Sequence, residues 1–216
     1  LASKIHFVAV DEFVKKVSCL TGSSNDIYSF GALSLDGLKN IKLPTWQNVR
    51  EKFEIPDVPF ILVTFHPETL NYKKNKIFSK VVYETLEILC KIKHIVISHA
   101  NADTMGSLYR SISIQLKNNF PSNITLVNNF GKENYFSAMN ACKMLIGNTS
   151  SGILEAASFG KYVINVGERQ AGRKRSKNVI DLSFDKNEII KNVKEIEKKG
   201  LYGGKNIYYK ANTAQK

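Results

Sequence analysis

The chain has 216 residues, of which 43% are hydrophobic and 23% are charged. This composition is typical of a globular protein with a sizeable core, and it excludes disorder throughout the chain. No apolar run approaches the roughly 20 residues of a membrane-spanning helix. The polar residues near the start argue against a signal peptide. The first residue is Leu1 rather than Met, so we expect the natural chain to begin further upstream.

The chain is basic, with 31 lysines and arginines against 19 acidic residues and a net charge of +12. A basic balance indicates an anionic partner, which can be nucleic acid, anionic lipid or a phosphorylated small molecule. The positive residues are scattered along the chain, however, and a lysine-rich composition explains the overall charge more simply. We therefore expect neither a nucleic-acid partner nor a membrane partner.

The three cysteines, Cys19, Cys90 and Cys142, are far apart and form no C-x-x-C pair. Cys90 and Cys142 lie among apolar residues and are interpreted as reduced core residues. A reducing compartment, and hence a cytoplasmic location, fits this usage. The four histidines lack ligand spacing with the cysteines, so no metal site is predicted.

The first 58 residues contain two short predicted strands and two short predicted helices. The strands span residues 5–10 and 26–31, and the helices span residues 12–19 and 46–53. We expect residues 1–58 to be the remnant of a first domain together with the connection to a second, which takes up residues 59–216.

From Phe60 onward, short apolar runs alternate with amphipathic segments. The runs predict strands at residues 60–65, 94–98, 124–127, 144–147 and 162–166. The segments between and after them predict helices at residues 78–89, 108–116, 135–139, 152–159 and 186–199. Nearly continuous apolar strands separated by helices indicate a parallel sheet that is covered on both faces. The predicted fold class is therefore α/β, with a doubly wound, Rossmann-like parallel sheet.

A polar cluster follows each of the five predicted strands of this second domain. The clusters are His66–Thr69, His99–Asp103, Asn128–Phe130, Asn148–Gly152 and Gly167–Gln170. Ligands of such sheets bind in the crevice beyond the carboxyl ends of the strands. The five clusters therefore predict a ligand site at one edge of the sheet.

Several residues in or just after these clusters suit an anionic nucleotide. Thr149 and Ser150 stand where a strand meets a helix, where hydroxyls and main-chain N–H groups bind phosphate, although either could simply cap the helix. Glu155 suits ribose hydroxyls, with a capping-box role as the alternative. Arg169, at a strand end, needs an anionic partner. Arg173 and Arg175 are expected to be solvated, with an approach to phosphate as the alternative.

His66 directly follows a strand and precedes Pro67, a position from which it can donate to phosphate or act as an acid or base. His99 competes for that role. The chain has neither a Walker loop nor a G-x-G-x-x-G motif, so dinucleotide redox chemistry lacks its usual fingerprint. No cofactor is predicted.

Three segments resemble the UDP-N-acetylglucosamine 2-epimerase family. They are Thr64–Thr69, Ile146–Ala156, with its GNTSSGILEA sequence from Gly147, and Asn165–Arg173, with GERQAGR from Gly167. The closer similarity is to the hydrolysing branch of sialic acid and legionaminic acid biosynthesis. The motifs typical of the non-hydrolysing branch, His-Arg-x-Glu-Asn and Ser-Gly-Gly-x-Gln-Glu-Glu, are absent from these places.

The resemblance implies a glycosyltransferase-B-like architecture of two Rossmann-like domains, with UDP bound mainly to the C-terminal one. By this resemblance, residues 59–216 are the UDP-binding domain. The resemblance also implies a missing N-terminal domain that carries the catalytic carboxylates, and a homodimer. The chemistry implied is elimination of UDP to 2-acetamidoglucal, followed by addition of water to give N-acetylmannosamine. His66 is then the catalytic candidate, and the residues implied to bind the UDP-sugar are His66, Asn101, Phe130, Thr149, Ser150, Glu155 and Arg169, with Asp103 close by.

The chain departs from the family at Lys161-Tyr162, where Lys-Pro is usual, and at Thr149, where Ser is frequent. We expect it to be a C-terminal portion that binds UDP weakly and does not turn over alone. Two other enzymatic interpretations remain open: an epimerase acting on a UDP-2,4-diacetamido-2,4,6-trideoxyhexose, and a glycosyltransferase of the same fold. A basic nucleic-acid-binding module is the non-enzymatic alternative, although no recognition motif supports it.

Overall fold

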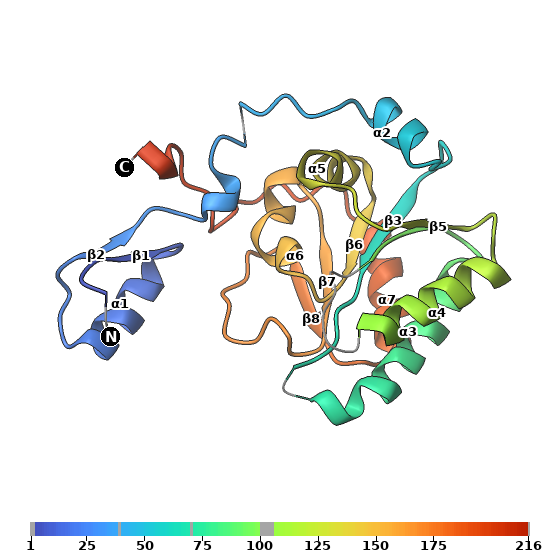
Figure 1. Cartoon of the computed structure of the whole chain (residues 1–216), viewed down its shortest axis with the longest axis horizontal. Coiled ribbons are helices and arrows are strands. Elements are labelled where there is room, and N and C mark those ends of the chain that lie inside the picture. Colours follow the sequence, from blue (N-terminus) through green and yellow to red (C-terminus); the bar gives the residue numbers. More distant parts are fainter. Residues whose placement is uncertain (1–2, 39, 70, 100–105, 216) are drawn as a thin grey trace. The chain divides into compact units, whose positions relative to one another are not determined.

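The computed structural model describes residues 3–38, 40–69, 71–99 and 106–215. The chain divides into two compact units (Figure 1), which are described separately. The first comprises Leu1–Lys42 and Lys205–Lys216, and the second comprises Leu43–Gly204.

The first unit is a parallel pair of short strands, β1 (His6–Val8) and β2 (Ile27–Ser29), joined through α1 (Asp11–Thr21). A parallel pair needs such a crossover, and α1 ends at Gly22, whose φ of 73° suits the left-handed helix cap. The short helices η1 (Leu33–Leu35) and η4 (Thr213–Gln215) also belong to this unit.

The C-terminal segment is fastened to the first unit by side-chain contacts. The Lys210 ammonium donates to Asp11 Oδ1 at 2.7 Å, and the Thr213 hydroxyl donates to the Phe30 carbonyl at 2.7 Å. The Tyr208 side chain is buried. Residues 205–216 therefore lie with the N-terminal segment rather than with the large sheet, which differs from the expected assignment to the second domain.

The second unit is built on six parallel strands in the order β5–β4–β3–β6–β7–β8. Their bounds are β3 Phe60–Thr64, β4 His94–Ser98, β5 Ile124–Val127, β6 Met144–Gly147, β7 Val163–Val166 and β8 Val179–Leu182. The chain runs outward from β3 through β4 to β5, and then returns to begin β6 on the other side of β3. This is the strand order of a doubly wound sheet, and the switch point lies between β3 and β6.

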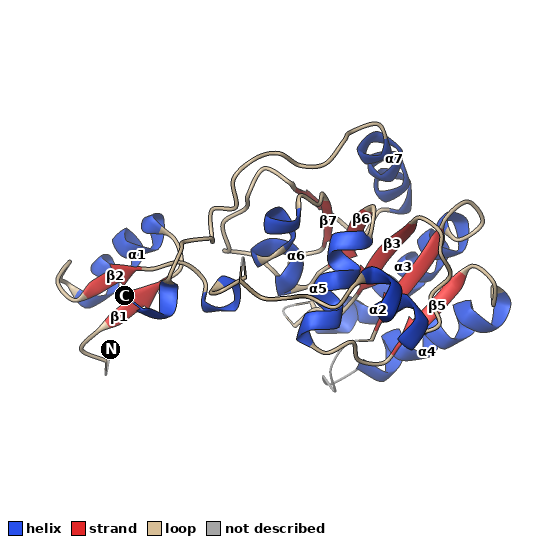
Figure 2. Cartoon of the chain, turned by 90° about the horizontal axis from the view of Figure 1, so that it is seen from above, coloured by secondary structure: helices blue, strands red, loops and turns tan. Residues whose placement is uncertain are grey.

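Helices cover both faces of this sheet (Figure 2). One face packs against α3 (Asn75–Leu89), α4 (Gly106–Asn119) and α7 (Lys186–Glu197). The other packs against α2 (Trp46–Lys52) and α5 (Lys132–Ala141), with Ala156 of η3 (Ala156–Phe159). Alternate strand residues enter the two cores, so Ile61 and Val63 face one layer while Phe60 and Leu62 face the other. The remaining short elements are η2 (Tyr72–Lys74) and α6 (Ser150–Leu154). The predicted doubly wound, Rossmann-like α/β fold is confirmed.

Two features of the second unit differ from expectation. The unit begins at Leu43 rather than at residue 59, because residues 43–58 pack onto the sheet: Trp46 stacks on Phe60 with 4.9 Å between ring centroids, and Val49 and Ile55 are buried. Strand β8 was not predicted at all. It lies at the sheet edge and contains an exposed Asp181, so it lacks the continuous apolar run of the other strands.

None of the helices in the described part of the chain combines the length and the apolar character that a membrane span requires.

Candidate active site

Asn148 joins the ends of the two strands at the switch point. Its side chain is fully buried, its Oδ1 accepts the His66 main-chain N–H at 2.7 Å, and its Nδ2 donates to the His66 carbonyl at 2.8 Å. The preceding Gly147 has a φ of 150°, and a Cβ there would lie 1.8 Å from the Thr64 carbonyl oxygen. The close approach of β3 and β6 therefore requires glycine, and it leaves Asn148 placed to hold the main chain of His66.

Glu68 joins the loop after β3 to the loop after β7. Its side chain is buried, and Oε1 accepts the main-chain N–H groups of Glu168 at 3.1 Å and Arg169 at 3.2 Å. The Asn148 Nδ2 also lies 3.5 Å from this oxygen. Sequence analysis placed Glu68 in a polar cluster but gave it no role, because its partners lie about a hundred residues further along the chain.

A third contact closes the network between the loops. The Gln170 side chain is buried, and its Nε2 donates to the Asn148 carbonyl at 2.9 Å. The loops after β3, β6 and β7 are therefore fixed to one another by buried polar side chains. His66, Thr149, Ser150 and Arg169 stand on these loops, at the carboxyl ends of neighbouring strands.

Thr149 serves as the N-cap of α6, and its hydroxyl oxygen accepts the Gly152 N–H at 3.2 Å. The capping interpretation thus holds for this residue. A hydroxyl that accepts one hydrogen bond keeps its own proton to donate, so the cap does not preclude a contact with a ligand. Ser150 begins α6 and is half-buried.

Glu155 lies at the end of α6 and is buried. Tyr135 of α5 lies nearby: burial raises the pKa of Tyr135 to about 12, with smaller contributions from Cys142 and Glu155, while the hydroxyls of Thr64 and Thr149 act in the opposite direction. Tyr135 was predicted only as part of a helix. Its neighbours place it beside the candidate site, a position that helical spacing alone does not reveal.

Phe130 was predicted to stand at the uracil. Its ring is buried in the core, where it packs against Phe53 with 4.7 Å between ring centroids and against Tyr135 at 6.1 Å. The ring has no free face to stack on a base, so this residue can meet a ligand only through its main chain. The predicted contacts of Asn101 and Asp103 lie outside the described residues.

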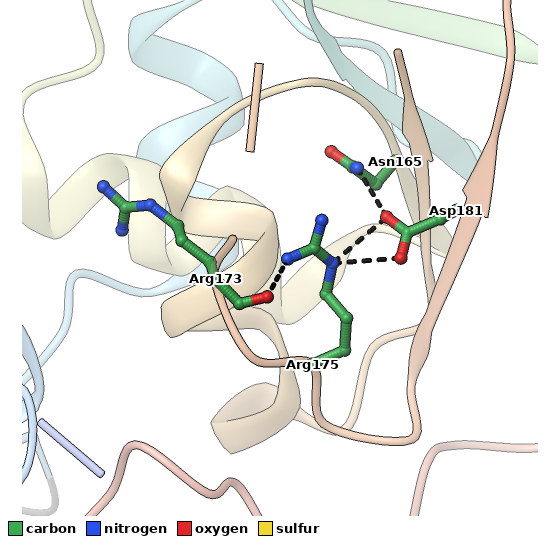
Figure 3. A network of polar contacts seen from close by, with 4 residues as sticks. All are labelled: Asn165, Arg173, Arg175 and Asp181. Atoms are coloured by element: carbon green, nitrogen blue, oxygen red, sulfur yellow. Dashed lines mark hydrogen bonds and ion pairs between the residues drawn. The ribbon is translucent and has the colours of Figure 1, made fainter. Parts of the chain in front are cut away.

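The loop from β7 to β8 is anchored at its far end by the network of Figure 3. Arg175 Nε donates to the Asp181 carboxylate at 3.0 and 3.1 Å, and Asn165 Nδ2 donates to the same carboxylate at 2.6 Å. Arg175 also donates to the Arg173 carbonyl, while the Arg173 guanidinium points away from the network. The expectation of a solvated side chain is thus confirmed for Arg173, which is exposed, and wrong for Arg175, which forms an ion pair.

His99, the competitor of His66, lies beside a cavity of about 370 Å³ that Tyr109 and Arg110 also line. Burial, together with the positive charge of Arg110, lowers the pKa of His99. The lowered pKa favours the neutral form of this histidine.

Comparison with known proteins places these features in a family. The chain is 32% identical over 180 residues to the GDP/UDP-N,N'-diacetylbacillosamine 2-epimerase (hydrolyzing) of Campylobacter jejuni, an alignment that covers 83% of this chain and 47% of that protein. It is 29% identical to the UDP-N,N'-diacetylbacillosamine 2-epimerase (hydrolyzing) of Legionella pneumophila, with 99% and 56% covered. The chain thus spans about half the length of these relatives.

Among solved structures, the UDP-GlcNAc 2-epimerase of Methanocaldococcus jannaschii in complex with UDP-GlcNAc and UDP has the same fold. The TM-score is 0.73 at 17% identity, over 99% of this chain and 59% of that one. The sequence profile of the UDP-N-acetylglucosamine 2-epimerase family matches residues 1–216. The chain therefore belongs to the UDP-N-acetylglucosamine 2-epimerase family.

Proposed function

We propose that this chain is the nucleotide-binding part of a hydrolysing UDP-sugar 2-epimerase, and that it holds the diphosphate at the edge where β3, β6 and β7 end. The observation that carries the proposal is the buried network of Glu68, Asn148 and Gln170, which fixes three loops at the switch point. Ligands of doubly wound sheets bind at that point. The loops present a histidine, two hydroxyls and an arginine there, and these groups suit an anionic ligand.

In this proposal the Thr149 and Ser150 hydroxyls and the Arg169 guanidinium bind the diphosphate. On the family resemblance, His66 stands at the diphosphate near the reacting sugar, and Asn148 holds its main chain in place. Glu155 accepts hydrogen bonds from the ribose hydroxyls. Asn101 is retained as a ligand contact on the family resemblance alone, and Phe130 meets the uracil through its main chain.

The proposed chemistry begins with cleavage of the bond between the sugar C1 and the diphosphate oxygen, while a base removes the C2 proton from the opposite face. Negative charge grows on the departing diphosphate, and fixed donors aimed at it lower the barrier. Water then adds across the resulting double bond, with hydroxyl at C1 and a proton at C2, and this gives the 2-epimer. The residues of this chain serve the leaving group, and we assign the base to the rest of the enzyme.

Titration of the 216-residue chain with UDP tests the binding site. Arg169→Ala and Ser150→Ala should each weaken binding, Arg169→Ala by roughly tenfold or more, since a hydrogen bond to a charged group contributes about 1.5–3 kcal/mol. Arg50→Ala on α2 is the matched control: it removes the same charge from a residue paired with Asp57, and it should leave the affinity unchanged. Equal affinity in wild type, R169A and S150A would remove the proposed site.

The identity of the sugar in the UDP-sugar substrate is tested separately. One candidate substrate is UDP-N-acetylglucosamine, and the other is a UDP-2,4-diacetamido-2,4,6-trideoxyhexose. The second is supported by the two relatives described above, which are named for diacetylbacillosamine. The protein from the longest reading frame that contains these residues should release UDP and a free 2-epimerised sugar from one of them, as followed by NMR. Release of neither product from either sugar would refute the epimerase assignment.

Two further elements of the proposal concern the whole protein. We propose that it works as a cytoplasmic homodimer whose N-terminal domain completes the cleft. The three free cysteines agree with a reducing compartment.

A further inference from the structure

We propose that Glu68 is a positioning residue of the nucleotide site: its carboxylate fixes the Gly167–Arg169 turn and thereby sets the direction of the Arg169 side chain. The part of this inference that concerns UDP rests on the proposed function. The part that concerns the turn rests on the geometry alone.

The first observation is the pair of hydrogen bonds that Glu68 accepts. One carboxylate oxygen, Oε1, takes the N–H groups of two consecutive residues, Glu168 and Arg169, at 3.1 and 3.2 Å. Consecutive main-chain N–H groups in a turn form a concavity that binds anions. Here the protein fills that concavity with its own carboxylate. These N–H groups are therefore engaged already, so the turn contributes to a ligand site through its side chains rather than through these amides.

The second observation is that Gly167 makes room for this carboxylate. Gly167 has a φ of +86°, and a Cβ at this position would lie 2.3 Å from Glu68 Oε1. Glu68, together with the Phe184 ring at 2.5 Å, thus occupies the space that a Cβ at residue 167 would need. Glu68 and Gly167 form a matched pair: the turn needs a hydrogen-bond acceptor at residue 68 and the space that glycine leaves at residue 167.

The third observation is that Glu68 is itself held in place. Its N–H donates to Asn75 Oδ1 at 2.9 Å, and Asn75 Nδ2 donates to the Glu68 carbonyl at 3.0 Å. Asn75 is fully buried at the start of α3. Glu68 therefore connects the helix layer to the turn after β7, and a change at this residue should be transmitted to Arg169.

The charge of Glu68 separates a positioning role from a direct ligand contact. A carboxylate close to a diphosphate repels it, so Glu68 is not suited to bind the ligand directly. Its Oε2 accepts no hydrogen bond from the described residues. Glutamine keeps the acceptor at Oε1 and removes the charge. The E68Q variant should therefore keep the turn, whereas alanine should release it.

The test compares E68A, E68Q and wild type by amide hydrogen exchange without ligand and by UDP titration. In E68A we expect the amides of Glu168 and Arg169 to exchange at least roughly tenfold faster, and UDP to bind roughly tenfold more weakly. In E68Q both quantities should stay within about threefold of wild type. Asn178→Ala is the control, because this buried residue bonds Lys161 just before the start of β7, at the other end of that strand. It should lower stability without changing either readout.

The outcomes separate the two proposals. Unchanged protection of both amides in E68A, or a loss in E68Q equal to that in E68A, would overturn the positioning role. The positioning role would also be overturned if the amides of Glu168 and Arg169 lose protection in E68A while E68A binds UDP as tightly as wild type does. If the amides lose protection but wild type does not bind UDP, the held turn is supported and the proposed function fails. Should E68A not fold, E68D shortens the side chain by one methylene and should give an intermediate loss.

Discussion

Asn148→Ala is the substitution that most directly tests how the site is assembled. The side chain is fully buried and makes two short hydrogen bonds to the main chain of His66. Alanine removes both of these hydrogen bonds from the half-buried main chain of His66. The ends of β3 and β6 then lose the link that extends their pairing beyond the strands.

The expected loss of stability follows from these two hydrogen bonds. The loss of a buried hydrogen bond costs about 1–3 kcal/mol, and partial access to water at His66 reduces this figure. We therefore expect a loss of about 2–4 kcal/mol in the free energy of unfolding. With a urea m-value of about 2 kcal/mol/M, the midpoint of unfolding falls by about 1–2 M.

Urea denaturation followed by circular dichroism measures this shift. The matched control is Asn140→Ala, which makes the same change at an exposed position of α5 and should be neutral or slightly stabilising, because alanine favours helix. The reasoning is refuted if N148A unfolds within about 0.3 M of wild type, or if N140A loses as much stability as N148A.

Two further predictions concern stability alone. Gly147→Ala should lower the free energy of unfolding by about 3 kcal/mol or more, or prevent folding, because the new Cβ would lie 1.8 Å from the Thr64 carbonyl oxygen. A urea midpoint equal to that of wild type would contradict this. Burial lowers the pKa of His94, whose ring nitrogen bonds the Thr125 hydroxyl at 3.0 Å. Between about pH 6.5, the ordinary pKa of histidine, and the lowered pKa of the folded state, the unfolded state therefore binds more protons than the folded state. The free energy of unfolding falls as the pH falls through this range. His94→Gln should flatten this loss between urea midpoints measured at pH 7.5 and 5.5, and an identical pH dependence in the variant would exclude His94 as its source.

The sheet was predictable because its strands are buried on both faces. Runs such as residues 60–65 and 144–147 are apolar almost throughout, and this pattern is found in parallel strands between helix layers. The edge strand β8 lacks that signal. Residues 205–216 carry no apolar run either, so their return to the first unit depends on tertiary contacts such as Lys210 with Asp11.

The gathering of polar loops at one edge of the sheet was predictable for a related reason. The carboxyl ends of parallel strands meet at one edge, so polar residues after each strand gather there. What the sequence could not reveal is how the loops are held. Asn148 reaches back 82 residues to His66, and Glu68 reaches forward 100 residues to Glu168, and neither separation has a local pattern. The buried ring of Phe130 is likewise a matter of packing that motif matching does not address.

The central claim is that a diphosphate binds where the loops after β3, β6 and β7 meet. The most direct measurement is an NMR titration of the ¹⁵N-labelled chain with UDP, compared with uridine, which lacks the diphosphate. We predict that UDP shifts the amide signals of residues 148–152 and 167–170 most strongly and that uridine leaves them nearly in place. Equal shifts with both ligands, or UDP shifts confined to other parts of the chain, would contradict the claim.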